Sequence, residues 1–299
     1  MLRLTLLTAL LAVACAGPSR AVSTPVGETG SRAPAEYTLP KQLRYSFTLR
    51  NTTARPISKV EFLTLAPVPR TSHQWLEKLT ATRPYQASLD SLGNQVLRFE
   101  LETLPPYASR IISITADLKM AERSAESSGD DVARFTRPER YIESSDPRVS
   151  ELARAVRDPS ALRTVRQAYD WVAANVQPSD YVPDERGARY LLEQRRGDCT
   201  EFAYLVTALS RANGVPARPM GGYLLQGNAI VGAADYHNWA EVLIDGRWLV
   251  VDAHQKSFAE HQTDYVAMRI ISTEAAEDAP AVVFNRYEIR TPGVEVSMN

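Results

Sequence analysis

Residues 197–214 read GDCTEFAYLVTALSRANG, and they predict the central helix of the molecule. Apolar side chains recur after the cysteine at i, i+3, i+4 and i+7, which is the spacing of one buried helix face. Asp198 is a good N-cap residue, and Glu201 follows it at the spacing of a capping box. Gly214 supplies the C-terminal stop. Cys199 is therefore expected in the first turn of a mostly buried helix.

The start of such a helix suits a reactive thiol. Its free N–H groups and macrodipole favour an anion, and therefore the thiolate. The same N–H groups could hold the oxyanion of an acyl-transfer intermediate. Asp198 opposes the thiolate with a nearby negative charge, so a basic partner is needed. The helix alone does not decide between a catalytic cysteine and a small residue used for packing.

A hairpin further along the chain offers that partner. The β-rich runs 239–244 and 247–252 flank Asp245-Gly246, a pair that favours a two-residue type I′ turn. This turn sets the register, so His237 and Asp252 fall on one face as diagonal neighbours. Such neighbours are roughly 7–8 Å apart at the backbone, within reach of an imidazole and a short carboxylate. The register predicts a hydrogen bond that orients His237 as a base.

Two alternatives concern the other histidines. His254 is expected on the same face, directly across from His237, and could compete for the role of base. A zinc site drawn from His237, His254, Asp252 or Cys199 is conceivable because these ligand types suit zinc. No HExxH or CxxC spacing supports it, so we expect neither a metal nor another cofactor. His261 lies beyond the hairpin and is expected to face solvent.

The amino-terminal residues have the pattern of an export signal. In residues 1–16, Arg3 precedes a short apolar run that is too short to span a bilayer. The run ends in LAVAC, which resembles a bacterial lipobox with Cys15 as the lipidated residue; ordinary secretion is the alternative. Residues 17–36 fit a flexible spacer. The expected location is the bacterial cell envelope, where a lipid anchor in the membrane holds a protein that faces the periplasm.

Composition narrows the partners. The 299 residues include 34 basic and 35 acidic side chains, for a net charge of −1. This balance gives no electrostatic case for nucleic acid, which needs a basic footprint. The chain has two cysteines, and with Cys15 processed, Cys199 cannot form an internal disulfide. The oligomeric state is not indicated.

The pattern of apolar residues predicts two domains. Residues 37–120 alternate with period 2 in short runs, as in a small immunoglobulin-like β-sandwich. Residues 121–140 are expected to be a linker or an exposed hairpin. A second, helix-containing domain is predicted over 141–275, with a C-terminal extension over 276–299. The stretches 267–272 and 281–289 could add strands to the second domain or lie against the sandwich.

Residues 141–253 resemble the transglutaminase-like superfamily in three ordered blocks. These read RGDCTE at 196–201, SRANGVPAR at 210–218, and HNWAEV at 237–242 leading to WLVVD at 248–252. The resemblance implies an α+β fold with a papain-like core, in which the thiol helix packs on an antiparallel sheet. The preceding β-domain is similar to the sandwich that often comes before this core in bacterial members.

Carried over by position, the resemblance makes Cys199 the nucleophile, His237 the base and Asp252 the orienting acid. It favours His237 over its rival because Asn-Trp-Ala-Glu follows it. The chain departs from the family after the acid, where alanine replaces the more usual proline; this affects the wall of the site. Tyr181 and Trp239 are the candidates for the oxyanion contact or that wall.

The chemistry implied is attack by the thiolate on a carboxamide or peptide carbonyl, which gives a thioester. Water as the second substrate makes the enzyme a protease or amidase, and an amine makes it a crosslinking transglutaminase. For an anchored bacterial protein we favour hydrolysis of peptides or amides at the envelope, with a peptide or a protein as the substrate. The alternative to an enzyme is an envelope scaffold or binding module that uses the sandwich as a docking surface.

Overall fold

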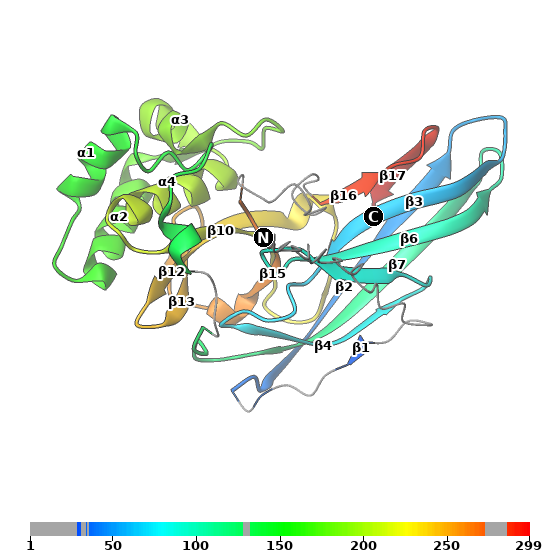
Figure 1. The fold of residues 1–299 in the computed structure, drawn as a ribbon, viewed down its shortest axis with the longest axis horizontal. Helices are drawn as coiled ribbons and strands as arrows, with labels where there is room; N and C mark the ends of the chain where they lie inside the picture. The colour runs from blue at the N-terminus through cyan, green and yellow to red at the C-terminus, as the bar shows by residue number, and fades with distance from the viewer. Residues whose placement is uncertain (1–28, 31–33, 35, 128–131, 273–285) are drawn as a thin grey trace, which may run out of the picture.

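The computed structural model describes residues 29–30, 34, 36–127, 132–272 and 286–299. The predicted signal segment, Cys15 and most of the spacer lie outside these ranges, as does residue stretch 276–285 of the C-terminal extension. The described chain has a mixed α+β fold, with a strand-rich part and a helix-containing part side by side (Figure 1). None of its described helices is long and apolar enough to cross a bilayer.

The strand-rich part is a sandwich of two mostly antiparallel sheets. The first has the order β1 (Thr29–Gly30), β4 (Gln74–Ala81), β7 (Ser109–Met120), β2 (Leu39–Asn51) and β11 (Ala229–Ile230), with β17 (Val294–Met298) also paired to β2. The second has the order β16 (Tyr287–Ile289), β3 (Ile57–Ala66), β6 (Gln95–Leu104) and β5 (Gln86–Leu89). Side chains of β2 alternate between buried and more exposed positions, which confirms the predicted period.

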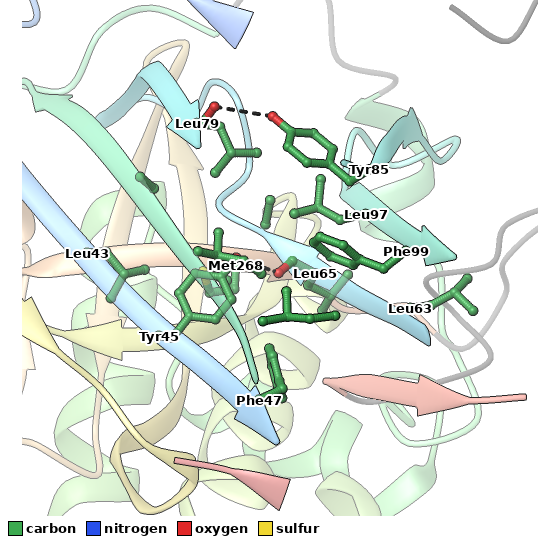
Figure 2. Close-up of a cluster of buried hydrophobic side chains, with 14 of the residues drawn as sticks. Leu43, Tyr45, Phe47, Leu63, Leu65, Leu79, Tyr85, Leu97, Phe99 and Met268 are labelled. Atoms are coloured by element: carbon green, nitrogen blue, oxygen red, sulfur yellow. Dashed lines mark hydrogen bonds between the residues drawn. The ribbon is translucent and has the colours of Figure 1, made fainter. Parts of the chain in front are cut away.

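Aromatic and aliphatic side chains from both sheets fill the space between them (Figure 2). The rings of Phe47 and Phe62 lie 5.0 Å apart between centroids. The Tyr45 hydroxyl donates to the carbonyl oxygen of Leu65 at 2.9 Å, so its polar end is satisfied within the core. Burying each such side chain stabilises the fold by about 1.5–3 kcal/mol.

The second part packs helices on one antiparallel sheet. Its helices are α1 (Pro147–Ala155), α2 (Ala161–Asn175), α3 (Gly187–Gln194) and α4 (Cys199–Ala212). The sheet order is β14 (Ser257–Phe258), β13 (Arg247–Asp252), β12 (Tyr236–Ile244), β10 (Ala217–Leu224) and β15 (Tyr265–Ile270). A short parallel pair joins β8 (Gln177–Pro178) to β9 (Arg196–Gly197) just before α4. Helix α4 lies between the sheet and the other helices and is buried over most of its length.

One hydrophobic cluster extends across both parts. Tyr223 and Leu225 near the end of β10, and Val266 and Met268 on β15, belong to the same buried cluster as the sandwich interior. Figure 2 shows Met268 among the sandwich side chains. Strand β15 extends the core sheet, whereas β16 and β17 pair with β3 and β2 of the sandwich. The stretch 267–272 therefore contributes a strand to the core sheet, and the described part of 281–289 lies against the sandwich.

The segment expected to be a linker, 121–140, contacts the core. It contains a short 3-10 helix, η1 (Val132–Thr136). Phe135 is buried and meets the ring of Trp248 edge-on at 5.4 Å. Arg211 of α4 donates to Glu139 at 2.7 Å, a buried ion pair. These contacts hold the segment against both the sheet and the thiol helix.

Candidate active site

Cys199 is the first residue of α4, as the capping pattern predicts. The Asp198 carboxylate accepts from the Thr200 N–H at 2.8 Å, and Glu201 accepts from the Asp198 N–H at 3.0 Å, which completes the capping box. The thiol side chain is half-buried. At this first helical position the backbone N–H has no acceptor within the helix, so it remains available to a bound group.

Two contacts tie the preceding loop to the helix start. The Arg186 guanidinium donates to the buried Glu201 carboxylate at 2.7 Å. The Val182 N–H donates to Asp198 at 3.0 Å. The loop that carries Tyr181 is therefore anchored beside Cys199 on both sides.

The hairpin has the predicted register. Ile244 pairs with Arg247, and the pairing continues as far as Ala240 with Val251. Asp245 and Gly246 have φ values of 49° and 75°, the positive values that a type I′ turn requires. His237 Nε2 donates to Asp252 Oδ2 at 2.6 Å, so the expected hydrogen bond is present.

Further bonds hold the Asp252 carboxylate in place. Its Oδ2 also accepts from the Tyr265 hydroxyl at 3.1 Å, and its Oδ1 accepts from the Gln255 N–H at 3.0 Å. The residue is 2% exposed. With both oxygens engaged and water excluded, the carboxylate has one orientation, which in turn orients the imidazole of His237.

The imidazole lies between this carboxylate and the thiol. Burial alone would lower the pKa of His237, but hydrogen bonds to Asp252 and Cys199, together with their negative charges, raise it to about 9. Because Asp252 occupies Nε2, Nδ1 is the ring nitrogen left for Cys199. His237 is therefore protonated at neutral pH. The structure brings together Cys199, His237 and Asp252, which the sequence had singled out.

A pocket of about 340 Å³ opens beside Cys199. Its walls come from the loop at 181–185, the start of α4, the start of β12 and the C-terminal segment; among the residues that line it are Tyr181, Thr200, Tyr236, Asn238 and Arg286.

The two aromatic candidates occupy different places. Tyr181 lines the pocket at its rim and is 57% exposed. Trp239 is 1% exposed and does not line the pocket. Its ring is nearly parallel to the imidazole of His237, at 6.5 Å and 17°, and meets Tyr265 edge-on at 5.1 Å. Trp239 thus supports the base from within the core.

Sequence reasoning did not single out Tyr236 and Asn238, which flank the base on β12. Neighbouring residues of a strand point to opposite faces, so these two side chains face away from that of His237. Asn238 Nδ2 donates to Thr200 Oγ1 at 2.9 Å, which joins the strand to the thiol helix. The alternation of side chains along this strand could have identified both residues from the sequence.

Arg286 was also missed, and no local signal pointed to it. It donates to the carbonyl oxygen of Ala233 at 2.6 Å and lies 5.2 Å above the ring of Tyr236. Its own carbonyl oxygen accepts from the Leu65 N–H at 3.3 Å. Arg286 therefore connects the pocket wall to the sandwich across more than 200 residues of sequence.

His254 lies beside the base, as the register suggested. Its ring is 5.5 Å from that of His237 and meets Phe202 edge-on at 5.2 Å. Burial lowers the pKa of His254, and the positive charge of His237 lowers it further. The neutral form of His254 is therefore favoured beside the imidazole of His237. In the described ranges, no three His, Cys, Asp or Glu side chains are grouped so that they could hold a metal ion.

Residues 149–253 match the family model of the transglutaminase-like superfamily, and this part of the chain belongs to that superfamily. No match was found among curated proteins. The structure is similar to that of a candidate cysteine protease from Cytophaga hutchinsonii, with a TM-score of 0.61 and 18% identity over 91% of this chain and 92% of that chain. It also matches the periplasmic domain of TgpA from Pseudomonas aeruginosa, with a TM-score of 0.39 and 17% identity over 78% and 94% of the two chains. The likeness to the Cytophaga structure shows a shared fold across both parts of the molecule.

Proposed function

We propose that this protein is a cysteine enzyme that cleaves amide or peptide bonds through Cys199, His237 and Asp252. The supporting observation is the imidazole of His237, which lies between a buried carboxylate and the thiol and has its pKa raised to about 9. In the proposed mechanism, this imidazole accepts the proton of the thiol. The nucleophile is then a thiolate beside an imidazolium.

In the first step, Cys199 Sγ attacks the carbonyl carbon and the carbonyl oxygen becomes negative. As this intermediate collapses, the C–N bond breaks and the amine leaves with the proton of His237. The acyl group remains on sulfur as a thioester. Asp252 stabilises the imidazolium before the transfer and keeps the neutral imidazole in position after it.

In the second step, His237 removes a proton from water as the water oxygen attacks the thioester; the C–S bond breaks, the carboxylic acid leaves, and the Cys199 thiolate remains beside the protonated His237. We favour this hydrolysis because the fold is shared with a candidate cysteine protease. Transamidation is the second candidate, because the exposed carboxylates of Asp184 and Glu185 on the pocket wall would attract an alkylammonium group. Mass analysis of peptide products, with and without a primary amine, distinguishes a new carboxylate from a new amide.

The thiol chemistry is tested by the rate at which iodoacetamide alkylates Cys199 at pH 7, measured by mass spectrometry of the peptide that contains it. A free cysteine is only about 3% ionised at this pH. We expect Cys199 to react at least about tenfold faster than free cysteine, because the helix start and the imidazole of His237 both favour negative charge on its sulfur. His237→Asn is expected to bring the rate to within about threefold of free cysteine.

The matched control is His261→Asn, which changes an exposed histidine outside the pocket. Asparagine tolerates the positive φ of 48° at that position. The control is expected to react like the unmodified chain. A Cys199 that reacts no faster than free cysteine, at a rate unchanged by His237→Asn, would disprove the proposal and favour a binding module.

We further propose that the chain is exported and anchored to the bacterial envelope by lipid on Cys15. The support is the apolar segment and the LAVAC sequence of residues 11–15. Two signals, or several acyl chains on one cysteine, are needed for a stable anchor. Mass spectrometry of the mature amino terminus is expected to show an acylated Cys15. An unmodified terminus beyond residue 15 would contradict the anchor.

A further inference from the structure

Two buried polar atoms next to Cys199 lack a partner. The hydroxyl oxygen of Tyr236 and Oδ1 of Asn238 are buried, and neither has a hydrogen-bond partner in the described structure. Leaving a buried polar group unpaired is destabilising, so native proteins rarely do it without a reason. Both residues line the pocket that holds the thiol.

The two atoms gather over one glycine. Gly221 of β10 pairs with Asn238 in the sheet. A Cβ at Gly221 would lie 2.1 Å from the Tyr236 hydroxyl oxygen and 2.8 Å from Asn238 Oδ1. Because Gly221 has no side chain, the Tyr236 hydroxyl can reach this position. The hydrogen bond from Asn238 to Thr200 joins the strand of both residues to the thiol helix.

Only one of the two atoms can serve as a donor. Asn238 commits its Nδ2 to Thr200, and the oxygen that remains can only accept. The Tyr236 hydroxyl can donate, because burial raises its pKa to about 12 and the proton stays on the oxygen. The ring is held in place by Tyr223, edge-on at 5.6 Å, and by the guanidinium of Arg286 above it at 5.2 Å.

The Tyr181 hydroxyl and the Trp239 indole N–H are less suitable as donors to a group in the pocket. Tyr181 is 57% exposed, so water already competes for its hydroxyl. Trp239 has a buried indole N–H without a partner in the described structure, but it does not line the pocket. A donor that is buried, unpaired and rigidly held at the wall of the pocket is what stabilises a developing negative charge best.

We propose that the Tyr236 hydroxyl is a catalytic donor that binds the carbonyl oxygen attacked by Cys199. It donates to that oxygen as the S–C bond forms and the oxygen becomes negative, together with the free N–H at the start of α4. This role rests on the proposed acyl transfer, and Gly221 acts as the positioning residue that leaves room for the hydroxyl. Asn238 acts through Thr200 to hold the strand against the thiol helix.

Two reagents separate this role from activation of the thiol. With p-nitrophenyl acetate, Sγ attacks a carbonyl carbon, an oxyanion forms, and p-nitrophenolate leaves as the C–O bond breaks. With iodoacetamide, Sγ attacks a saturated carbon and iodide leaves, so no oxyanion forms. Both rates are measured on the full chain by mass spectrometry of the Cys199 peptide.

Tyr236→Phe is expected to lower the acetylation rate by about 100-fold, the usual loss for one oxyanion donor, and to leave alkylation within about twofold. Gly221→Ala is expected to lower the ratio of the acetylation rate to the alkylation rate, because its Cβ displaces the Tyr236 hydroxyl without removing it. Tyr107→Phe is the matched control: it makes the same chemical change at an exposed tyrosine outside the pocket and should change neither rate beyond about twofold.

The outcomes distinguish this proposal from the one on which it rests. An acetylation-to-alkylation ratio that Tyr236→Phe leaves within threefold of the unmodified chain would overturn the donor role, even with a reactive Cys199. So would an equal loss in both reactions, because the hydroxyl would then act on the thiol. If Cys199 is no more reactive than free cysteine, the proposed function fails, yet the ratio of the two slow reactions still tests the donor.

Discussion

Asp252→Asn is expected to lower the rate of acyl transfer by Cys199 by about 10³- to 10⁴-fold, the loss seen when the acid of a triad becomes an amide. The asparagine keeps the size of the side chain and an oxygen for the Gln255 N–H. It removes the negative charge that stabilises the imidazolium of His237 at 2.6 Å. Peptide hydrolysis or thioester formation at saturating reagent measures the effect.

The same substitution should change the titration of His237. Burial is the largest influence on its pKa and lowers it; Asp252 and Cys199 together raise it to about 9. With only Cys199 left to oppose burial, we expect the pKa of His237 to fall. NMR titration of the imidazole gives the value directly, and the rate of iodoacetamide alkylation at pH 7 should fall with the imidazolium population.

The free energy of unfolding should depend on pH in a defined window. The pKa of His237 is about 9 in the folded chain, above its ordinary value of 6.5, so protonation favours folding. This contribution is fully present below pH 6.5 and is lost as the pH rises through 9. It amounts to at most about 3 kcal/mol. Urea unfolding at pH 6 and pH 9.5 should show a smaller loss of stability for Asp252→Asn than for the unmodified chain.

The matched control is Asp245→Asn at the far end of the same hairpin. Asparagine is as suitable as aspartate in a type I′ turn, and this residue is exposed. It should leave both the pKa of His237 and the rates unchanged. An Asp252→Asn chain whose His237 still titrates near 9 would show that the carboxylate does not set the protonation of the base.

Gly222→Ala is expected to lower the free energy of unfolding by at least about 3 kcal/mol, a large loss for one methyl group. A Cβ at this position would lie 2.0 Å from the carbonyl oxygen of Val266 and 3.0 Å from the N of Met268. Both are backbone atoms of β15 and cannot move aside without breaking the pairing with β10. The ring of Trp239, 3.0 Å from the same point, closes another side.

Urea unfolding measures this loss, and Gly227→Ala is its control. A Cβ at Gly227 would meet nothing within 4 Å, so that chain should unfold within about 0.5 kcal/mol of the original. Gly222 pairs with His237 on the neighbouring strand. We therefore expect any Gly222→Ala protein that folds to lose activity as well. A loss of less than about 1 kcal/mol would mean that β10 and β15 can separate without cost.

The sequence predicts those parts of the site that depend on near neighbours. Asp198 and Glu201 determine where α4 begins, because a cap is formed by residues within one turn. Asp245-Gly246 determines the register that brings Asp252 to His237, because a two-residue turn leaves one pairing. These local rules account for the thiol, the base and the acid, which lie on two elements with strong turn and cap signals.

Other parts of the site depend on contacts between distant segments. Tyr236 follows the alternation of β12, but the room for its hydroxyl depends on the glycine that β10 presents opposite. Arg286 reaches the pocket only because the C-terminal segment returns to β3. No periodic pattern encodes such a return, since the same apolar stretch could pair with either sheet.

By itself, the sequence determined the helix that carries Cys199, the hairpin that joins His237 to Asp252, and the alternation of the sandwich strands. The tertiary structure alone decided how the sandwich and the core share one hydrophobic cluster, and which side chains surround the thiol. The physical reason is distance along the chain. Caps and turns are selected by neighbours a few residues apart, whereas the pocket is selected by burying apolar surface between segments that only the complete fold brings together.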